Sequence, residues 1–249
     1  MRSGSRISAA LVGLATLPLG VLLSGCVTTQ QVAARARLVD ARIRASQTPL
    51  RLTRESPDVR VTRVSLLHGL GGTALAVALR NTSTRSLTDL PIVVGLTTAA
   101  GRKLYLNRSA NVDYLDNHVV VLPARGLVTW VYTSGRRLPS AARPFAEVGV
   151  TQLPEPVAGT LPRVAVNRVP SGSSSLARTL SVSVSNLSGI PQYSVPVYAV
   201  AVRSGRWLAA GRAIVAHLGT HGQATVRLTL LGSPRAASLR LSVLPTIFQ

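Results

Sequence analysis

An internal repeat constrains the fold of this chain more than any other feature. Residues 74–83 read ALAVALRNTS, and residues 179–188 read TLSVSVSNLS. In both segments larger apolar residues alternate with small or polar ones, which is the period of a half-buried strand. Each strand is followed by an asparagine, Asn81 or Asn186, a residue type that tolerates turn conformations. We therefore expect two copies of one β module.

Further landmarks recur in the same order in both copies. Pro91 and Pro196 each follow the asparagine by ten residues and are expected to open a second strand, because a strand's first residue tolerates proline. Glycine turns come next, at Gly101 and Gly205. The other expected strands are 59–67, 92–96, 128–132 and 145–150 in the first copy, and 163–168, 197–202, 224–230 and 239–243 in the second.

Short strands separated by Gly, Pro and Asn turns indicate antiparallel sandwiches, and no alternating helical segments suggest a parallel α/β sheet. The predicted fold class is mainly β, with two tandem antiparallel Ig-like β-sandwich domains after an N-terminal signal peptide and a short helix. The predicted ranges are a signal peptide at 1–25, a lipid-anchored tether with a short helix at 26–57, a first sandwich at 58–153, a linker at 154–162 and a second sandwich at 163–249.

The amino terminus has the layout of a secretory signal. Arg2 and Arg6 precede an apolar stretch over residues 7–23, and small residues follow it. The segment Leu23-Ser24-Gly25-Cys26 resembles the bacterial lipobox, the recognition sequence of lipoprotein processing. Cys26 is the only cysteine, so no disulfide can form within the chain.

The lipobox resemblance implies a role for each of these residues. Leu23, Ser24 and Gly25 would be recognised by the signal peptidase, which would cut before Cys26. The Cys26 thiol would carry a diacylglyceryl group with fatty acids such as palmitate, and two acyl chains suffice for stable anchoring. The alternative is an uncleaved signal anchor, although a 17-residue stretch that contains Ser8 and Thr16 and is interrupted by Pro18 lies at the short limit for spanning a bilayer. Both interpretations place residues 27–249 outside the cytoplasm.

Residues 30–47 are expected to form a helix. Val32, Ala36, Val39 and Ile43 recur at spacings that align them on one face, with arginines around them. One interpretation lays this helix on an anionic membrane. The other makes it a stalk, or packs it on the first sandwich.

The module pattern is similar to the extracytoplasmic Ig-like modules of bacterial envelope lipoproteins, including the FxLYD type, in which an Asn ends one strand and a Gly-rich turn follows the next. Residues 201–203 read Ala-Val-Arg near the place of that type's Leu-Tyr-Asp. The resemblance implies a noncatalytic binding or assembly role.

The net charge of +20 comes almost wholly from arginine. A basic surface can attract anionic lipids or polymers. A GC-rich, actinobacterial-like coding bias also explains arginine, and the arginines form no dense run typical of an interaction tail.

Candidate chemical sites are few. His217 and His221 lie four residues apart but lack nearby further ligands for zinc. A cluster of oxygen-bearing side chains could bind calcium or form turns: Asn111, Asp113, Asp116 and Asn117, followed by His118. Residues 190–193 could form a partner surface or cover their own core.

No catalytic residue, metal site or cofactor is predicted, because the chain has only eight carboxylates and no serine-nucleophile motif. Nucleic-acid binding is disfavoured by export and by the small aromatic content. The predicted function is a membrane-anchored envelope lipoprotein on the extracytoplasmic face, acting as a noncatalytic binding, assembly or scaffold module. Its partners would be membrane lipid, through acylated Cys26, and an envelope protein or cell-wall component. The alternative is an extracytoplasmic carrier or sensor of a small anionic ligand.

Overall fold

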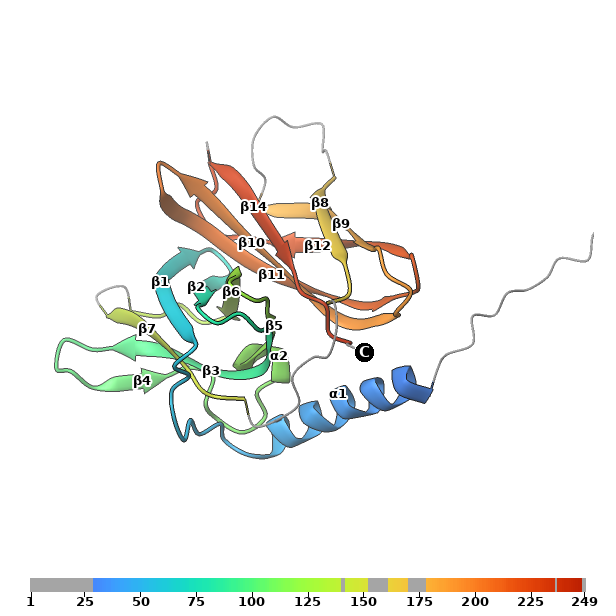
Figure 1. Cartoon of the computed structure of the whole chain (residues 1–249). Coiled ribbons are helices and arrows are strands. Elements are labelled where there is room, and N and C mark those ends of the chain that lie inside the picture. The colour runs from blue at the N-terminus through green and yellow to red at the C-terminus, as the bar shows by residue number, and fades with distance from the viewer. Residues whose placement is uncertain (1–28, 140–141, 152–160, 170–177, 236, 248–249) are drawn as a thin grey trace, which may run out of the picture.

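The computed structural model describes residues 29–139, 142–151, 161–169, 178–235 and 237–247, apart from the side chains of residues 30, 31, 45 and 46. It shows a helix followed by two antiparallel β-sandwiches, which confirms the predicted mainly β fold class (Figure 1). The signal peptide and most of the predicted linker, residues 154–160, lie outside the described residues.

The first module contains seven strands and one short helix. Its elements are β1 (Val59–Gly69), β2 (Gly72–Asn81), β3 (Leu87–Thr97), β4 (Lys103–Tyr105), α2 (Tyr114–Asn117), β5 (His118–Leu122), β6 (Leu127–Ser134) and β7 (Arg143–Val148). One sheet has the order β1-β2-β6. In the other sheet, β3 pairs with β4 and β5 on one side and with β7 on the other.

The second module repeats this arrangement. Its strands are β8 (Val164–Arg168), β9 (Thr179–Asn186), β10 (Gln192–Arg203), β11 (Arg206–Leu218), β12 (Gln223–Thr229), β13 (Leu231–Gly232) and β14 (Ser238–Val243). One sheet has the order β12-β9-β8, and the other has the order β13-β11-β10-β14. Strand β11 stands where the first module has β4 and β5, because both sets pair with the central strand of their sheet.

The repeated asparagines hold the same turn in both modules. The Asn81 Oδ1 atom accepts hydrogen bonds from the backbone N and the hydroxyl of Ser83, at 2.9 and 2.8 Å, and Asn186 does the same with Ser188, at 3.1 and 2.8 Å. Each Nδ2 atom donates to the carbonyl four residues ahead and to a carbonyl in the distant loop before β6 or β12, that of Pro123 or Gly219. Both side chains are buried, so these bonds replace water.

The two prolines do not open strands as expected. Pro91 lies inside β3 and Pro196 inside β10. The carbonyl of Pro91 accepts from Gly149 and that of Pro196 from Leu244, at the ends of the β7 and β14 ladders. The N–H and C=O groups of one strand residue point to the same side of the strand. The N–H that each proline lacks would therefore point to the end of the β7 or β14 ladder, where the loss of one ladder hydrogen bond is tolerated.

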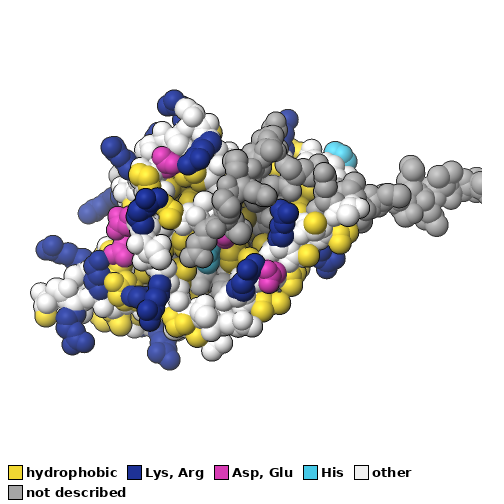
Figure 2. All heavy atoms as spheres, turned by 60° about the horizontal axis from the view of Figure 1, so that its bottom comes forward, with side chains coloured by type: hydrophobic (Ala, Val, Ile, Leu, Met, Phe, Trp, Pro, Cys, Tyr) yellow, Lys and Arg dark blue, Asp and Glu magenta, His cyan; other side chains and the backbone are white. Residues whose placement is uncertain are grey.

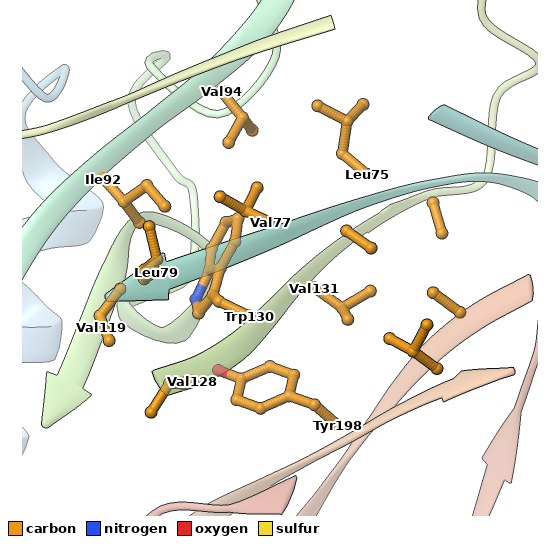
Figure 3. Packing of buried hydrophobic residues seen from close by; sticks show 14 of the residues in the cluster. Leu75, Val77, Leu79, Ile92, Val94, Val119, Val128, Trp130, Val131 and Tyr198 are labelled. Carbon is orange, nitrogen blue, oxygen red and sulfur yellow. The ribbon is translucent and has the colours of Figure 1, made fainter. Parts of the chain in front are cut away.

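Alternate residues of β2 fill the first core. Leu75, Val77 and Leu79 are wholly buried with Trp130 of β6, and Ile92 and Val94 of β3 join the same cluster (Figure 3). In the second module, β9 contributes Leu180, Val182 and Val184 to the equivalent core. The strict alternation in both sequences therefore places one face of each strand in its own sandwich.

The opposite face of β2 is buried as well. Ala74 and Ala76 belong to one apolar cluster with Val131 of β6 and with Tyr198 and Val200 of β10. The three-stranded sheet of the first module thus packs on the four-stranded sheet of the second (Figure 1). Figure 3 shows Tyr198 reaching from β10 toward Val128 and Val131. The two modules therefore share an apolar interface.

Candidate functional site

The predicted lipid-attachment residue Cys26 and the recognition residues Leu23, Ser24 and Gly25 lie outside the described residues. The described chain begins with helix α1 (Thr29–Gln47), close to the predicted range 30–47. Its first residue is three positions after Cys26. The arrangement of α1 therefore decides how an anchor at Cys26 is connected to the sandwiches.

Helix α1 is packed against the molecule through Leu38. This side chain is 8% exposed and shares a cluster with Tyr114, Leu115 and Val120 of the first module and with Ile247 at the end of the second. Ala34 and Ala41 of the helix are also packed against this cluster. The helix therefore packs on the first sandwich, one of the arrangements expected from the sequence, and also contacts the second module, which was not expected.

Two arginines of α1 strengthen the contact with the second module. The Arg42 guanidinium donates to the Ser194 hydroxyl at 2.6 Å. The Arg35 guanidinium lies 4.4 Å from the centroid of the Tyr193 ring, a cation–π distance. Both partners lie at the start of β10. Residues 190–193, expected in a loop as a partner surface or a cover of their own core, are partly in β10, which starts at Gln192. Ile190 and Tyr193 pack against the same cluster as α1.

The helix face identified from the sequence points away from this contact. Val32, Val39 and Ile43 are 56%, 48% and 50% exposed, and Ala36 is also exposed. Leu38 lies on a different side of the helix, because at about 100° per residue it is rotated by roughly 100° to 160° from each of these four positions. The helix consequently has two apolar sides, of which the sequence pattern revealed the outer one.

Part of the surface on which α1 packs, called its seat below, is a segment that the second module lacks. Between β4 and β5 the chain leaves the sheet over residues 106–117, whereas β11 runs without a break. Asn107 fills the gap in the ladder: its side chain accepts from the Val94 N–H at 2.9 Å and donates to the Ile92 carbonyl at 2.8 Å. The amide thus satisfies two backbone groups of β3 that a continuous neighbouring strand would have bonded.

The two carboxylates of this segment, Asp113 and Asp116, make contacts within the protein, and Asn111 lies in a turn with a φ of 67°. Asp113 caps α2 by accepting from the Leu115 N–H at 2.9 Å. Asp116 forms an ion pair with Arg212 of β11 at 2.8 Å, and Arg212 also donates to the Leu115 carbonyl at 3.1 Å. Burial raises the pKa of Asp116, and the nearby Arg212 opposes that shift. The Asp116–Arg212 pair therefore joins the α1 seat to the second module.

A second polar group lies beneath α1. The Tyr114 hydroxyl donates to Asp89, and the Tyr114 ring stacks on His118 with the ring centroids 4.5 Å apart. Burial lowers the pKa of His118, against the raising effect of Asp89. Burial, followed by the Asp89 charge, raises the pKa of Tyr114. His118 Nδ1 lies 2.6 Å from the Asn117 Oδ1 atom. These contacts position the seat and leave little of either ring exposed.

His217 and His221, considered as zinc ligands, occupy different local environments. His217 stacks on Tyr193, with the ring centroids 4.7 Å apart. His221 lies in a turn with a φ of 52°, as Arg125 does in the first module. Among the residues that the structure describes, no three His, Cys, Asp or Glu side chains gather closely enough to hold a metal ion.

An open groove of about 520 Å³ lies where the edges of the two modules meet beside their apolar interface, a region called the seam below. It is lined by residues 63–68 of β1, by Ala142 and Pro144 beside and within β7, and by Arg206 and Trp207 of β11. The Arg63 guanidinium lies 5.0 Å from the Trp207 ring centroid and donates to the Gly205 carbonyl at 2.6 Å. The lining includes two arginines and one histidine but no carboxylate, so the groove is basic.

Two features of the sequence indicate the α1 seat and the interface between the modules, although neither was recognised as such a signal. A spacing difference signalled the seat: Leu122 follows Gly101 by 21 positions, whereas Leu218 follows Gly205 by 13. The alanines at positions 74, 76 and 78 signalled the interface, because their counterparts in the second copy are Thr179, Ser181 and Ser183. In the described chain, neither helix combines the length and apolar character needed to cross a bilayer.

Comparison with known proteins gives no family. No family model and no curated protein matches the chain. Among solved structures, the chain is similar over 74% of its length to red sea bream transglutaminase, with 14% identity, a TM-score of 0.24 and 29% of that chain covered. It is also similar over 82% of its length to the C-terminal globular domain of oligosaccharyltransferase from Pyrococcus abyssi, with 10% identity, a TM-score of 0.23 and 51% of that chain covered.

Proposed function

We propose that this chain is a membrane-anchored lipoprotein of the bacterial cell envelope, exposed on the extracytoplasmic face, whose two sandwiches form a noncatalytic binding, assembly or scaffold module. The anchor is the lipid on Cys26, and the partner is an envelope protein or a cell-wall component. The main supporting observation is the position of α1, which starts three residues after Cys26 and is packed on both modules. An anchor at Cys26 would therefore hold the whole body and not one loosely tethered domain.

The seam groove is the surface that best suits a partner. It combines a half-buried tryptophan, Trp207, with the two arginines Arg63 and Arg206, residue types that are enriched at binding hot spots. Lipid anchoring confines this surface to a thin layer above the membrane. That confinement raises the effective concentration of the groove near partners in the same layer without any new contact.

The noncatalytic role is proposed from the use of the polar groups. Asp89 accepts a hydrogen bond from Tyr114. Asp113 caps α2, and Asp116 pairs with Arg212. His118 and His217 stack on tyrosines. Each of these groups has a structural partner that also fixes its orientation.

A second candidate function is the carriage or sensing of a small anionic ligand. It is favoured by the basic lining of the same groove, where Arg63, His68 and Arg206 occur without a carboxylate. Titration calorimetry with inorganic phosphate and with citrate distinguishes the two functions. Binding that is lost in Arg206→Gln would support this second function, and no heat of binding for wild type would count against it.

The proposed function is tested by photo-cross-linking in intact cells, with a photoreactive amino acid at Arg206 in the groove. Arg227, an exposed residue of β12, gives the matched control position. We expect an identified envelope protein or cell-wall fragment to be captured from position 206 and not from 227. That adduct should decrease strongly in Cys26→Ser. Capture of the same cytosolic proteins with and without Cys26 would contradict the proposal.

A further inference from the structure

The outer side of α1 carries an apolar stripe that lies along the helix. Val32, Ala36, Val39 and Ile43 are separated by 4, 3 and 4 residues, so they stay on one side over about 16 Å. The three larger side chains are about half exposed. The stripe lies away from the packed side of α1, which holds Leu38. Among the described elements, α1 runs along one end with both sandwiches on its other side (Figure 1).

The orientation of the stripe is fixed by the packed side of the helix. Leu38 is buried between the two modules, and Arg42 bonds to Ser194. Turning the helix to bury the stripe would expose Leu38 and break both arginine contacts with β10. The stripe therefore stays outward as long as α1 is seated.

The distance to the proposed anchor is short. A fully extended chain covers about 10 Å over three residues, so a lipid on Cys26 would keep Thr29 within about that distance of the headgroups. A helix starting so close to a bilayer either stands up from it or lies along it. Its seat on the body fixes its direction relative to the sandwiches, and the apolar stripe favours the second arrangement.

The charge around the helix suits an anionic surface. Two of the four arginines of α1, Arg35 and Arg42, contact β10, whereas Arg37 and Arg44 are exposed. The helix has one aspartate, Asp40, which pairs with Arg44. Figure 2 shows the end of the molecule that holds α1, where hydrophobic side chains lie among Lys and Arg side chains and acidic ones are few. Interfacial helices typically combine an apolar face with flanking cations that reach the headgroups.

From these observations we infer that α1 lies along the surface of the anionic membrane that holds the anchor, with Val32, Ala36, Val39 and Ile43 turned into the bilayer interface. This inference rests on the proposed function and adds an orientation to it. Strand β10 (Gln192–Arg203) contacts the helix near its start, through Tyr193, and ends at Arg203. The seam groove beside Arg206 therefore lies at the end of β10 that is farther along the strand from α1.

The experiment uses the mature lipidated protein in vesicles of phosphatidylglycerol and phosphatidylcholine with brominated acyl chains, which quench nearby tryptophan. Val39→Trp places the probe in the stripe. Ala33→Trp is the matched control, because Ala33 is exposed, lies about 120° around the helix and is closer to Cys26 in sequence. Wild type gives the background of Trp130 and Trp207. We expect at least twofold stronger quenching at position 39 than at 33.

Other outcomes separate this inference from the proposed function. Equal quenching at the two positions, or stronger quenching at position 33, would show that only the anchor brings the helix near the lipid, and would overturn the orientation of α1. Shielding of position 39 by a second copy, seen as a dimer in sedimentation before vesicles are added, would also overturn it. A protein whose Cys26 carries no acyl chain in mass spectrometry would contradict the proposed function itself.

Discussion

The outer faces of two equivalent strands, β2 and β9, show how one framework was adapted to two positions. Both strands place large apolar residues in their own sandwich. On the other face, β2 carries Ala74 and Ala76, buried against the second module, whereas β9 carries Thr179 and Ser181, which are exposed or partly exposed. Small apolar residues let a sheet approach another sheet closely, and hydroxyl residues suit a face in contact with water. The first module can therefore stack on the second through the outer face of β2, whereas the outer face of β9 suits contact with water.

The modules also differ at the edge next to α1. The second module has an unbroken β11, and the first interrupts the equivalent strand with residues 106–117. That interruption provides Tyr114 and Leu115 for the helix and Asp116 for Arg212. The same framework therefore provides most of the contact surface for α1 in one copy and an unbroken strand that bonds to that surface through Arg212 in the other.

The largest expected difference concerns the two equivalent core positions on β6 and β12. Trp130 pairs with Val77, and Val226 pairs with Val182. Trp130→Ala removes a wholly buried ring and should lower the free energy of unfolding by about 3–5 kcal/mol. Val226→Ala, at a half-buried position, should cost about 1 kcal/mol. Urea unfolding followed by circular dichroism measures both, and equal losses would refute the assignment of the first core.

The next comparison concerns the outer faces. Ala76→Arg forces a guanidinium into the apolar interface and should lower the free energy of unfolding by about 3 kcal/mol. Ser181→Arg, at the equivalent position of β9, should change it by less than about 0.5 kcal/mol. The same unfolding measurement applies. A tolerated arginine at position 76 would mean that the modules do not stack through β2.

The asparagine turns should respond alike. Asn81→Ala and Asn186→Ala each leave buried carbonyls without their side-chain donor, so each should cost about 2 kcal/mol. Differential scanning calorimetry of the two variants checks the equality. A large cost for one variant and none for the other would show that only one turn depends on its asparagine.

The smallest expected effect is on pH dependence. His118 occupies the position of Ile214 in the second module, since they pair with Pro91 and Pro196. Burial lowers the pKa of His118 below its ordinary 6.5, so the unfolded chain binds the proton more readily. Stability from this group is present above pH 6.5 and is lost as the pH falls toward the folded-state pKa. The unfolding free energy of His118→Ile should therefore decline less between pH 7.5 and 5.5 than that of wild type, and an unchanged slope would exclude His118 as a source.

The fold could be predicted from the sequence where short-range patterns decide it. Alternation at residues 74–79 and 179–184, and the asparagines after them, define strands and turns whose partners lie in the same module. The interface and the helix seat could not be predicted in the same way, because they depend on contacts between distant segments, such as Leu38 with Ile247 and Arg42 with Ser194. The side of α1 with the most regular apolar spacing is the exposed one. The packed side has one large apolar residue, Leu38, with small alanines beside it, and so shows no recognisable apolar pattern in the sequence.

The most direct test of the account is mass spectrometry of the N-terminal peptide of the mature protein extracted from membranes. Attachment of the body to the bilayer through α1 requires a mature chain that starts at Cys26 and carries a diacylglyceryl group on its thiol, and this is the predicted result. A mature chain that starts upstream of Cys26, or a Cys26 peptide without fatty acid, would contradict the account.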